Sequence, residues 1–227
     1  MRMLTSLIPA YVLLVLSEQT LLAQWVQTNG PNAGNVLCLA GSGANLFVGT
    51  DSCGVFLSTN SGVSWTTVNT GLTSLYILSL AIADTNFFAA TGGGFFRSTN
   101  AGASWTAVTA PAAITALATG DATLLFAGSE VGVLYFYNIQ TGEWVVQSTF
   151  FTGQWINALA FRGSTILFAA PLSRLYRSTN YGASWTHADT GLTNIIVSAL
   201  APTGTNLFVG TLGIGRASCR ERVYVLV

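Results

Sequence analysis

Residues 58–65 read Ser-Thr-Asn-Ser-Gly-Val-Ser-Trp, and the same phrase, Ser-Thr-Asn-x-Gly-x-Ser-Trp, returns at residues 98–105 and 178–185. The tryptophans that end these phrases belong to a longer series that recurs every 39 to 41 residues: Trp25, Trp65, Trp105, Trp144 and Trp185. A period of about 40 residues is typical of one four-stranded blade of a β-propeller. The chain is therefore expected to be a repeat protein.

Two further series of residues follow the same period. In one, a Leu-Ala pair comes after an aliphatic and a small residue; in the other, a phenylalanine stands two positions before a glycine or an alanine. The leucines are Leu39, Leu80, Leu117, Leu159 and Leu200, and the phenylalanines are Phe47, Phe88, Phe126, Phe168 and Phe208. The first copy predicts strands over residues 36–40, 46–50 and 55–59, with a fourth strand that starts at Trp65.

Composition supports an all-β fold. The 227 residues are 51% hydrophobic and 7% charged, which is typical of a globular protein with a substantial core. Short apolar runs rich in Val, Ile, Phe and Thr alternate with clusters of Gly, Asn and Ser, and no helical period follows residue 23. We therefore predict an all-β chain without helices, a β-propeller of four-stranded antiparallel blades.

The repeats are expected to occupy residues 24–213. Four complete blades fall at residues 35–70, 76–110, 113–149 and 155–190, and a partial fifth falls at residues 195–213. Residues 24–28, Gln-Trp-Val-Gln-Thr, read as a fourth strand without the three that should precede it. In closed propellers such a strand completes the last blade, which removes two exposed sheet edges.

The first 23 residues differ from the rest. Arg2 is followed by an apolar stretch over residues 4–16, and Leu21-Leu22-Ala23 offers a processing site. This pattern predicts a secretory signal peptide over residues 1–23. The apolar stretch is shorter than the roughly 20 residues of a membrane span, so an uncleaved anchor is the less favoured alternative. We expect a secreted, extracellular or cell-surface protein, with the periplasm as the alternative compartment and no stable membrane span after cleavage.

The chain changes character again at residue 214. Residues 214–223 read Ile-Gly-Arg-Ala-Ser-Cys-Arg-Glu-Arg-Val and interrupt the fifth repeat where a third strand and another turn are due. Back-translated, this run resembles a short-read sequencing adapter. We therefore expect residues 214–227 to be foreign to the protein and the chain to be a truncated fragment. A divergent natural C-terminus is the alternative.

Charged residues are scarce between residues 24 and 213. Four arginines stand against four aspartates and two glutamates, and lysine does not occur there. Nucleic-acid binding needs clustered basic residues, so we expect no nucleic-acid partner. Cys38 and Cys53 are expected about 10 Å apart, too far for a disulfide, because one strand separates them. They are predicted to be small buried hydrophobic residues.

The repeated turn has its own physical logic. The asparagine can hydrogen-bond to backbone amides ahead of it, the glycine can adopt positive φ, and the tryptophan can cover the turn. Because the same residues recur from blade to blade, we predict a structural role. They are Ser58, Asn60, Gly62 and Trp65, then Ser98, Asn100, Gly102 and Trp105, and then Ser178, Asn180, Gly182 and Trp185.

The pattern Ser-x-Asn-x-Gly-x-x-Trp resembles the Asp-box, or BNR, repeat of sialidases, sortilin ectodomains, xyloglucanases and photosystem II assembly factors. The resemblance covers residues 25–213, although Asn replaces the commoner Asp, and residues 137–144 lack the serine and shift the glycine by one place. It implies a peripheral turn away from the central ligand face, in a propeller of six to eight blades. The near-identical blades are most similar to secreted bacterial proteins without an assigned catalytic activity.

A glycoside hydrolase is one functional hypothesis, because sialidases and xyloglucanases share the repeat. Such chemistry usually needs two carboxyl groups about 5–10 Å apart, and a sialidase also needs three arginines around the substrate carboxylate. His187 has no acid or cysteine beside it, and the acidic residues fall in turns or at strand ends. We therefore predict no catalytic residue, metal or cofactor. The candidates considered are Asp51, Asp84, Asp121, Asp189, Glu130, Glu143, Arg97, Arg162, Arg174 and Arg177.

Binding is the second hypothesis. Tyr76 and Trp155 hold equivalent places before first strands, and Phe150 and Phe151 precede Trp155 in one loop. Exposed aromatic residues there would stack on sugar rings or anchor a protein, and packing between blades is the alternative. The third hypothesis, which we favour, is a non-catalytic secreted or cell-surface propeller that serves as a scaffold or interaction module for an unknown protein or glycan. The alternative is a carbohydrate-binding or sialidase-like propeller whose active residues lie in the missing part.

Overall fold

The computed structural model of the chain describes residues 30–31, 34–120, 122–162, 165–170, 174–192, 196–203, 206–211 and 222–226. These residues form nineteen strands and no helix, as predicted. The predicted signal peptide over residues 1–23, the predicted strand over residues 24–28 and residues 214–221 lie outside the described residues.

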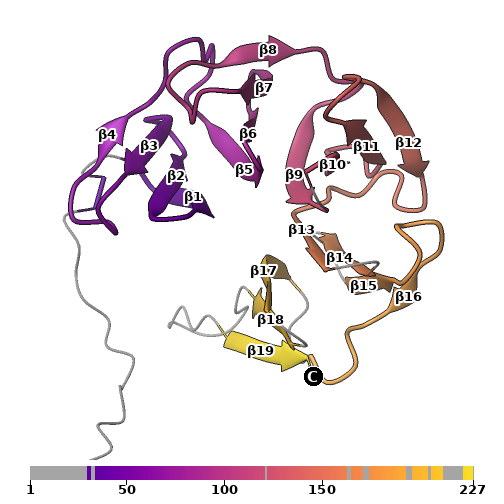
Figure 1. Cartoon of the computed structure of the whole chain (residues 1–227). Coiled ribbons are helices and arrows are strands. Elements are labelled where there is room, and N and C mark those ends of the chain that lie inside the picture. Colours follow the sequence, from indigo (N-terminus) through magenta and orange to yellow (C-terminus); the bar gives the residue numbers. More distant parts are fainter. Residues whose placement is uncertain are drawn as a thin grey trace, which may run out of the picture.

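Figure 1 shows five antiparallel sheets arranged around a common centre. Sheets 1 to 4 have four strands each and sheet 5 has three, and neighbours in a sheet are always neighbours in the chain. The first strand of each sheet lies nearest the centre and the fourth lies at the periphery. This is a partial β-propeller with four complete blades and a partial fifth, as the repeats predicted.

The strands follow the repeats closely. Sheet 1 contains β1 (Val36–Ser42), β2 (Asn45–Thr50), β3 (Val55–Ser58) and β4 (Thr66–Thr67). Sheet 2 contains β5 (Ile77–Ala83), β6 (Asn86–Thr91), β7 (Gly94–Ser98) and β8 (Thr106–Val108). Sheet 3 contains β9 (Ile114–Thr119), β10 (Leu124–Ser129), β11 (Leu134–Asn138) and β12 (Trp144–Ser148). Sheet 4 contains β13 (Ala158–Arg162), β14 (Thr165–Ala170), β15 (Arg174–Ser178) and β16 (Thr186–His187), and sheet 5 contains β17 (Val197–Thr203), β18 (Asn206–Thr211) and β19 (Arg222–Leu226).

Sheet 5 departs from the repeat after β18. In sheets 1 and 2 the hydroxyl that ends the second strand donates to a carbonyl at the approach to the third strand, Thr50 to Gly54 and Thr91 to Gly94, both at 2.9 Å. Thr211 holds the same position in sheet 5, and among the described residues its Oγ1 is buried without a hydrogen-bond partner. The place of the third strand is taken by β19, within the segment predicted to be foreign. That prediction concerns the gene, and it stays a prediction.

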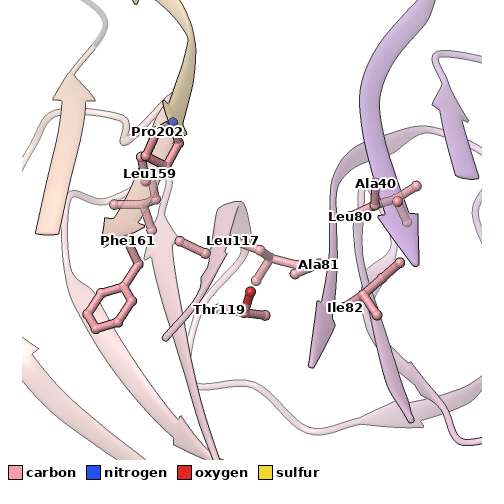
Figure 2. A pocket seen from close by; sticks show the side chains of 12 residues that line it. Ala40, Leu80, Ala81, Ile82, Leu117, Thr119, Leu159, Phe161 and Pro202 are labelled. Atoms are coloured by element: carbon pink, nitrogen blue, oxygen red, sulfur yellow. The ribbon is translucent and has the colours of Figure 1, made fainter. Parts of the chain in front are cut away.

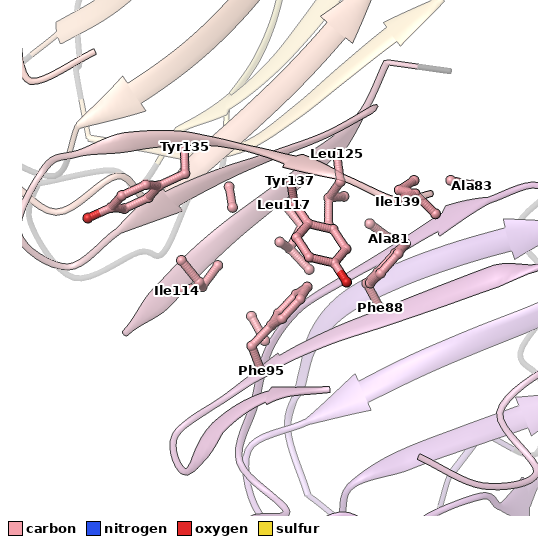
Figure 3. Close-up of a cluster of buried hydrophobic side chains, with 12 residues drawn as sticks. Ala81, Ala83, Phe88, Phe95, Ile114, Leu117, Leu125, Tyr135, Tyr137 and Ile139 are labelled. Carbon is pink, nitrogen blue, oxygen red and sulfur yellow. The ribbon is translucent and has the colours of Figure 1, made fainter. Parts of the chain in front are cut away.

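Neighbouring sheets pack through apolar clusters. Figure 3 shows the cluster between sheets 2 and 3. Phe88 and Phe95 of sheet 2 meet Tyr137 of sheet 3 edge to face, with ring centroids 5.8 and 5.9 Å apart. Trp144 packs against Phe95 with centroids 5.2 Å apart. Aromatic pairs of this geometry contribute more than their buried area alone.

The second strands come closest to the next sheet at their small residues. A Cβ atom added to Gly49 would lie 2.6 Å from Cγ2 of Ile77 in sheet 2, and one added to Gly128 would lie 2.5 Å from Cγ2 of Ile156 beside sheet 4. Real Cβ atoms do not approach that closely, so glycine is required at both positions. We conclude that these glycines set the spacing between neighbouring sheets.

The three Ser-x-Asn-x-Gly turns share one hydrogen-bond pattern. In sheet 1, Ser58 Oγ accepts from the Gly62 amide at 2.8 Å and donates to Asn60 Oδ1 at 3.0 Å. Asn60 Oδ1 also accepts from the Ser64 amide at 2.9 Å. The serine is buried and uses its hydroxyl as donor and acceptor at once. The same contacts recur in sheets 2 and 4 through Ser98, Asn100 and Gly102 and through Ser178, Asn180 and Gly182.

Positive φ was predicted for the glycine of this turn, and it occurs one residue earlier as well. Gly102 has a φ of 82°, and Ala101 before it has a φ of 54°. Ser61 and Tyr181 repeat the feature with φ values of 57° and 56°. The left-handed conformation costs an L-residue roughly 1–2 kcal/mol. The surrounding hydrogen bonds therefore hold one strained residue in each turn.

Three tryptophans tie their sheet to the preceding one. The indole N–H of Trp105 donates to the Val68 carbonyl at 2.8 Å, and that of Trp144 donates to the Thr109 carbonyl at 2.9 Å. Trp185 reaches Ser148 Oγ at 3.3 Å. Trp65 differs, because its indole donates to the Gly62 carbonyl of its own turn at 3.1 Å.

Sheet 3 replaces the serine turn with another one. Asn138 Oδ1 accepts from the amides of Gln140 and Thr141 at 2.9 and 3.1 Å, and its carbonyl accepts from the Gly142 amide at 2.8 Å. Ile139 is buried in the cluster between sheets 2 and 3. The shifted glycine in the sequence thus corresponds to a different turn that still leads into Trp144.

Removing the buried serine of a turn should cost much more than removing the exposed one. We expect Ser98→Ala to lower the free energy of unfolding by about 2 kcal/mol, because the Gly102 amide would be left buried without an acceptor. Ser104→Ala is the matched control, and it should cost under about 0.5 kcal/mol, because water can replace its exposed hydroxyl. Urea unfolding measures both. Equal losses would show that the buried hydroxyl has no special role.

Relief of the strained conformation should stabilise the chain. We expect Ala101→Gly to raise the free energy of unfolding by up to about 1 kcal/mol, because glycine tolerates a φ of 54°. Ala103→Gly, two residues further along the same turn, should lower it by about 0.5 kcal/mol through the entropy of the unfolded chain. Thermal unfolding of the two variants provides the comparison. A loss of stability in Ala101→Gly would contradict the idea of strain.

Candidate functional site

The ring has two chemically different ends. The Ser-x-Asn turns follow the third strands and lie at one end, while Tyr76 and Trp155 directly precede Ile77 and Ile156 at the other. We call the second the aromatic end. Tyr76 is 46% exposed and Trp155 is 53% exposed, so both side chains reach solvent. Tyr76 belongs to sheet 2 and Trp155 to sheet 4, so sheet 3 lies between them. In sheet 3 the corresponding residue, which precedes Ile114, is the small Ala113.

Hydrogen bonds to sheet 3 hold the loop that carries Trp155. The Gly153 amide donates to the Val131 carbonyl at 2.9 Å, and the Ile156 amide donates to the Ser129 carbonyl at 3.3 Å. The loop passes so close to Gly132 that a Cβ atom there would collide with the Gln154 carbonyl oxygen, 2.6 Å away. Trp155 is therefore presented on a backbone that sheet 3 holds in place.

The remaining predicted aromatic residues are placed differently from one another. Tyr76 packs over Gly92, where an added Cβ would lie 3.1 Å from its Cδ1. Phe150 is 62% exposed and meets the ring of Tyr176 at 5.8 Å. Phe151 is buried between sheets 3 and 4. The prediction of an exposed binding residue is therefore wrong for Phe151, which packs between blades instead. Of the two adjacent rings in this loop, that of Phe151 points into the core and that of Phe150 points to solvent.

The first strands border a central cavity that is lined mostly by aliphatic residues but also by Ser79, Asn157 and Ser198, and Figure 2 shows one part of it. Its wider part, about 580 Å³, lies toward the aromatic end, and a part of about 260 Å³ lies toward the turn end. Charged side chains are not among the residues that line either part. The leucines of the repeated Leu-Ala pairs stand on its wall: Leu39, Leu80, Leu117, Leu159 and Leu200. Their spacing was visible in the sequence, but their place beside the cavity was not predicted; Leu80, Leu117 and Leu159 are buried there against the preceding sheet.

The described carboxylates are distributed over the four complete sheets: Asp51, Asp84 and Asp189 belong to sheets 1, 2 and 4, and Glu130 and Glu143 lie before and after β11 in sheet 3. Asp51 follows β2 in sheet 1, where hydrogen bonds from Asn35 and Ser52 hold the pKa of its carboxyl below the ordinary value. Glu130 lies in a loop of sheet 3, and Asp189 pairs with Arg174 at 3.5 Å in sheet 4. Asp121 lies outside the described residues. The part of the chain that the structure describes contains no group of three or more His, Cys, Asp or Glu that could hold a metal.

The basic residues do not form a common cluster in the fold either. Arg97 lies in sheet 2 and directs Nε and Nη2 at Asn86 Oδ1, 2.9 and 2.6 Å away. Arg162, Arg174 and Arg177 lie in sheet 4. His187 lies on β16 with its ring 4.7 Å from that of Tyr176. Arg97, Arg174 and His187 therefore make structural contacts on third and fourth strands, whereas Arg162 ends β13, the inner strand of sheet 4.

The two described cysteines are free. Cys38 packs against the apolar cluster between sheets 1 and 2, and a Cβ added to Gly49, its partner in sheet 1, would lie 2.5 Å from its Sγ. Burial raises the pKa of the Cys38 thiol to about 12, against smaller opposing contributions from backbone hydrogen bonds of Gly49 and Leu80. A thiol in this state is not a nucleophile.

Solved structures share the fold at low identity. The GH74 enzyme of Niastella koreensis matches with a TM-score of 0.69 and 19% identity over 89% of this chain and 36% of that one. The extracellular domain of BT4673 from B. thetaiotaomicron matches with a TM-score of 0.66 and 21% identity over 82% of this chain and 27% of that one. YCF48 from Cyanidioschyzon merolae matches with a TM-score of 0.58 and 19% identity over 81% of this chain and 69% of that one. These likenesses show the β-propeller fold.

The comparisons go no further than the fold. The chain spans only 27% of the BT4673 domain and 36% of the Niastella enzyme. No family model matches the chain, and no curated protein matches it. Within the described residues, no helix is long and apolar enough to cross a membrane.

Cys38 should resist alkylation in the folded chain. With a pKa of about 12, its thiolate fraction at pH 8 is on the order of 0.0001, so we expect iodoacetamide to modify it at least about a hundredfold more slowly than in urea. Mass spectrometry of the Cys38 peptide measures the rate. Modification at equal rates with and without urea would show that Cys38 is neither buried nor electrostatically suppressed.

Proposed function

We propose that the chain is part of a secreted or cell-surface β-propeller that binds a partner at its aromatic end and does not catalyse a reaction. Tyr76 and Trp155 carry the proposal, because they are large, exposed and held on backbones that neighbouring residues fix. Pre-organised aromatic side chains give contact area at a low entropic cost. The partner is a glycan or a protein, and the rest of the ring is the scaffold.

The low charge of the described surface favours binding over hydrolysis. The described acidic residues are not among those that line the central cavity, whose described wall has no charged side chain. The serine turns support the interpretation that these are Asp-box, or BNR, repeats in which Asn60, Asn100 and Asn180 replace the commoner Asp. The signal-like residues 1–23 and the likeness to the extracellular domain of BT4673 support an extracellular location.

A glycoside hydrolase in the whole protein is the second candidate. The likenesses to the Niastella GH74 enzyme and to the GH74 xyloglucanase from Xanthomonas campestris favour it, the latter with a TM-score of 0.58 and 17% identity. In that case the catalytic groups would be contributed by repeats outside this sequence, and this part would supply aromatic contacts to the polysaccharide.

Binding can be tested with xyloglucan and immobilised cell-surface glycans as probes. We expect the double variant Tyr76→Ala and Trp155→Ala to weaken binding at least about tenfold, because stacked aromatic residues often dominate such interfaces. Tyr181→Ala is the matched control, since Tyr181 is 43% exposed but lies in a turn at the opposite end. Affinity electrophoresis or calorimetry measures the change. Equal binding by the double variant, or equal loss in the control, would remove the aromatic end as the site.

A further inference from the structure

The outer strand of sheet 3 differs from the outer strands of the other complete sheets. β12 has five residues, whereas β4, β8 and β16 have two, three and two. It lies at the periphery of the ring (Figure 1), where Val145 and Val146 are 52% and 58% exposed. Soluble proteins usually keep an edge strand short or charged, because an exposed edge pairs readily with other strands. The edge of sheet 3 is long, apolar and without a charged residue on β12.

The pairing of β12 with β11 determines which of its backbone groups face outward. The Asn138 amide donates to the Glu143 carbonyl at 2.9 Å, so these two residues form a hydrogen-bonded pair. Opposite residues in an antiparallel ladder alternate between hydrogen-bonded and non-hydrogen-bonded pairs. Val145 therefore bonds to β11, whereas Trp144 and Val146 are in non-hydrogen-bonded pairs. Trp144 and Val146 direct their N–H and C=O groups away from the sheet.

The corresponding edge of sheet 2 is covered by the loop that precedes it. The Trp105 amide donates to the Thr70 carbonyl at 2.8 Å, and a Cβ atom added to Gly71 would collide with the Trp105 carbonyl oxygen. The loop that precedes sheet 3 takes another course, since Ala110 packs into the cluster between sheets 2 and 3. Among the described residues, the Trp144 amide has no backbone acceptor outside its own sheet. The edge of sheet 3 is therefore open where that of sheet 2 is closed.

The open edge is complementary to itself. Because Trp144 and Val146 lie on either side of Val145, an antiparallel copy of β12 would pair each of them with the other, both pairs exchanging their backbone hydrogen bonds. Val145 would then face its own copy in a non-hydrogen-bonded pair, in which side chains lie closest. In this register Glu143 would face Gln147 of the second copy, so like charges would not oppose each other. Charge and hydrogen bonding therefore both permit this twofold pairing.

We propose that the edge of sheet 3 pairs with the same edge of a second copy of this chain, forming a twofold dimer through β12. Pairing satisfies the outward backbone groups and covers the exposed valines, which together drive the association. Two short strands bury less area than a standard protein interface, so the dimer forms over roughly the micromolar range of concentration. It is independent of binding at the aromatic end, because β12 contains neither Tyr76 nor Trp155.

Sedimentation of the full chain over about a hundredfold range of concentration tests the dimer. We expect the average mass to rise from that of one chain toward that of two. Val146→Lys should weaken association at least about tenfold, because lysine on an edge strand opposes pairing. Ala107→Lys, at the matching exposed position of sheet 2, should leave association unchanged. A monomer at every concentration, or equal association by Val146→Lys, would overturn the proposal.

Cysteine cross-linking tests the register. Val145→Cys should form a disulfide with its own copy, because the two Cα atoms would be about 4.5 Å apart, within the range of a disulfide. Val146→Cys is the matched control, since its two copies would be roughly 9 Å apart, beyond that range. We expect Val145→Cys to oxidise to a dimer at least about tenfold faster than Val146→Cys and than the unsubstituted chain. Equal rates in the two variants would overturn the twofold pairing about Val145.

Discussion

The distance between neighbouring sheets is the constraint on which the rest of the structure depends. Near the axis the second strand of one sheet faces the first-strand segment of the next so closely that Gly49 and Gly128 have no room for a Cβ atom. Farther out, neighbouring sheets are held apart by whole aromatic rings, such as Phe95 of sheet 2 against Trp144 of sheet 3. Because interiors are close-packed, small residues inside and large ones outside force each sheet to diverge from its neighbour. Because each sheet diverges from the next in this way, the sheets are arranged around a common centre and leave a cavity there.

Much of the fold could be predicted because the repeats give several independent readings of one pattern. The first strand of sheet 1 was expected at residues 36–40 and extends over Val36–Ser42, and the fourth begins at Thr66, one residue after the tryptophan. The turn was predicted from its asparagine and glycine. The strained residue between them was not, because Ser61, Ala101 and Tyr181 share no side-chain chemistry that would indicate a left-handed backbone. Its conformation is imposed by hydrogen bonds on either side of it.

The candidate site was harder to predict, because it depends on contacts between repeats. Phe150 and Phe151 are adjacent and chemically identical, but only Phe151 turns inward, into the cluster between sheets 3 and 4. The backbone that presents Trp155 is fixed by a loop of sheet 3, more than twenty residues earlier in the chain. Periodicity assigns a residue to a strand or a turn, but it does not tell which face a loop residue takes. That choice comes from the neighbouring repeat.

Features that recur in every sheet cannot distinguish one site, so function must depend on the differences between sheets. Those differences are concentrated around sheet 3. It lacks the serine turn, and it buries Ile139 in place of that turn. At its other end, Val131 and Gly132 receive the loop that carries Trp155. Sheet 2 contributes Tyr76 over Gly92 on the opposite side of sheet 3. A uniform scaffold would need none of these departures, whereas a ring that recognises a partner at its aromatic end needs local asymmetry there. The departures at Gly92, Val131 and Gly132 lie at the aromatic end and support the proposed binding site, whereas the replaced serine turn of sheet 3 lies at the opposite end.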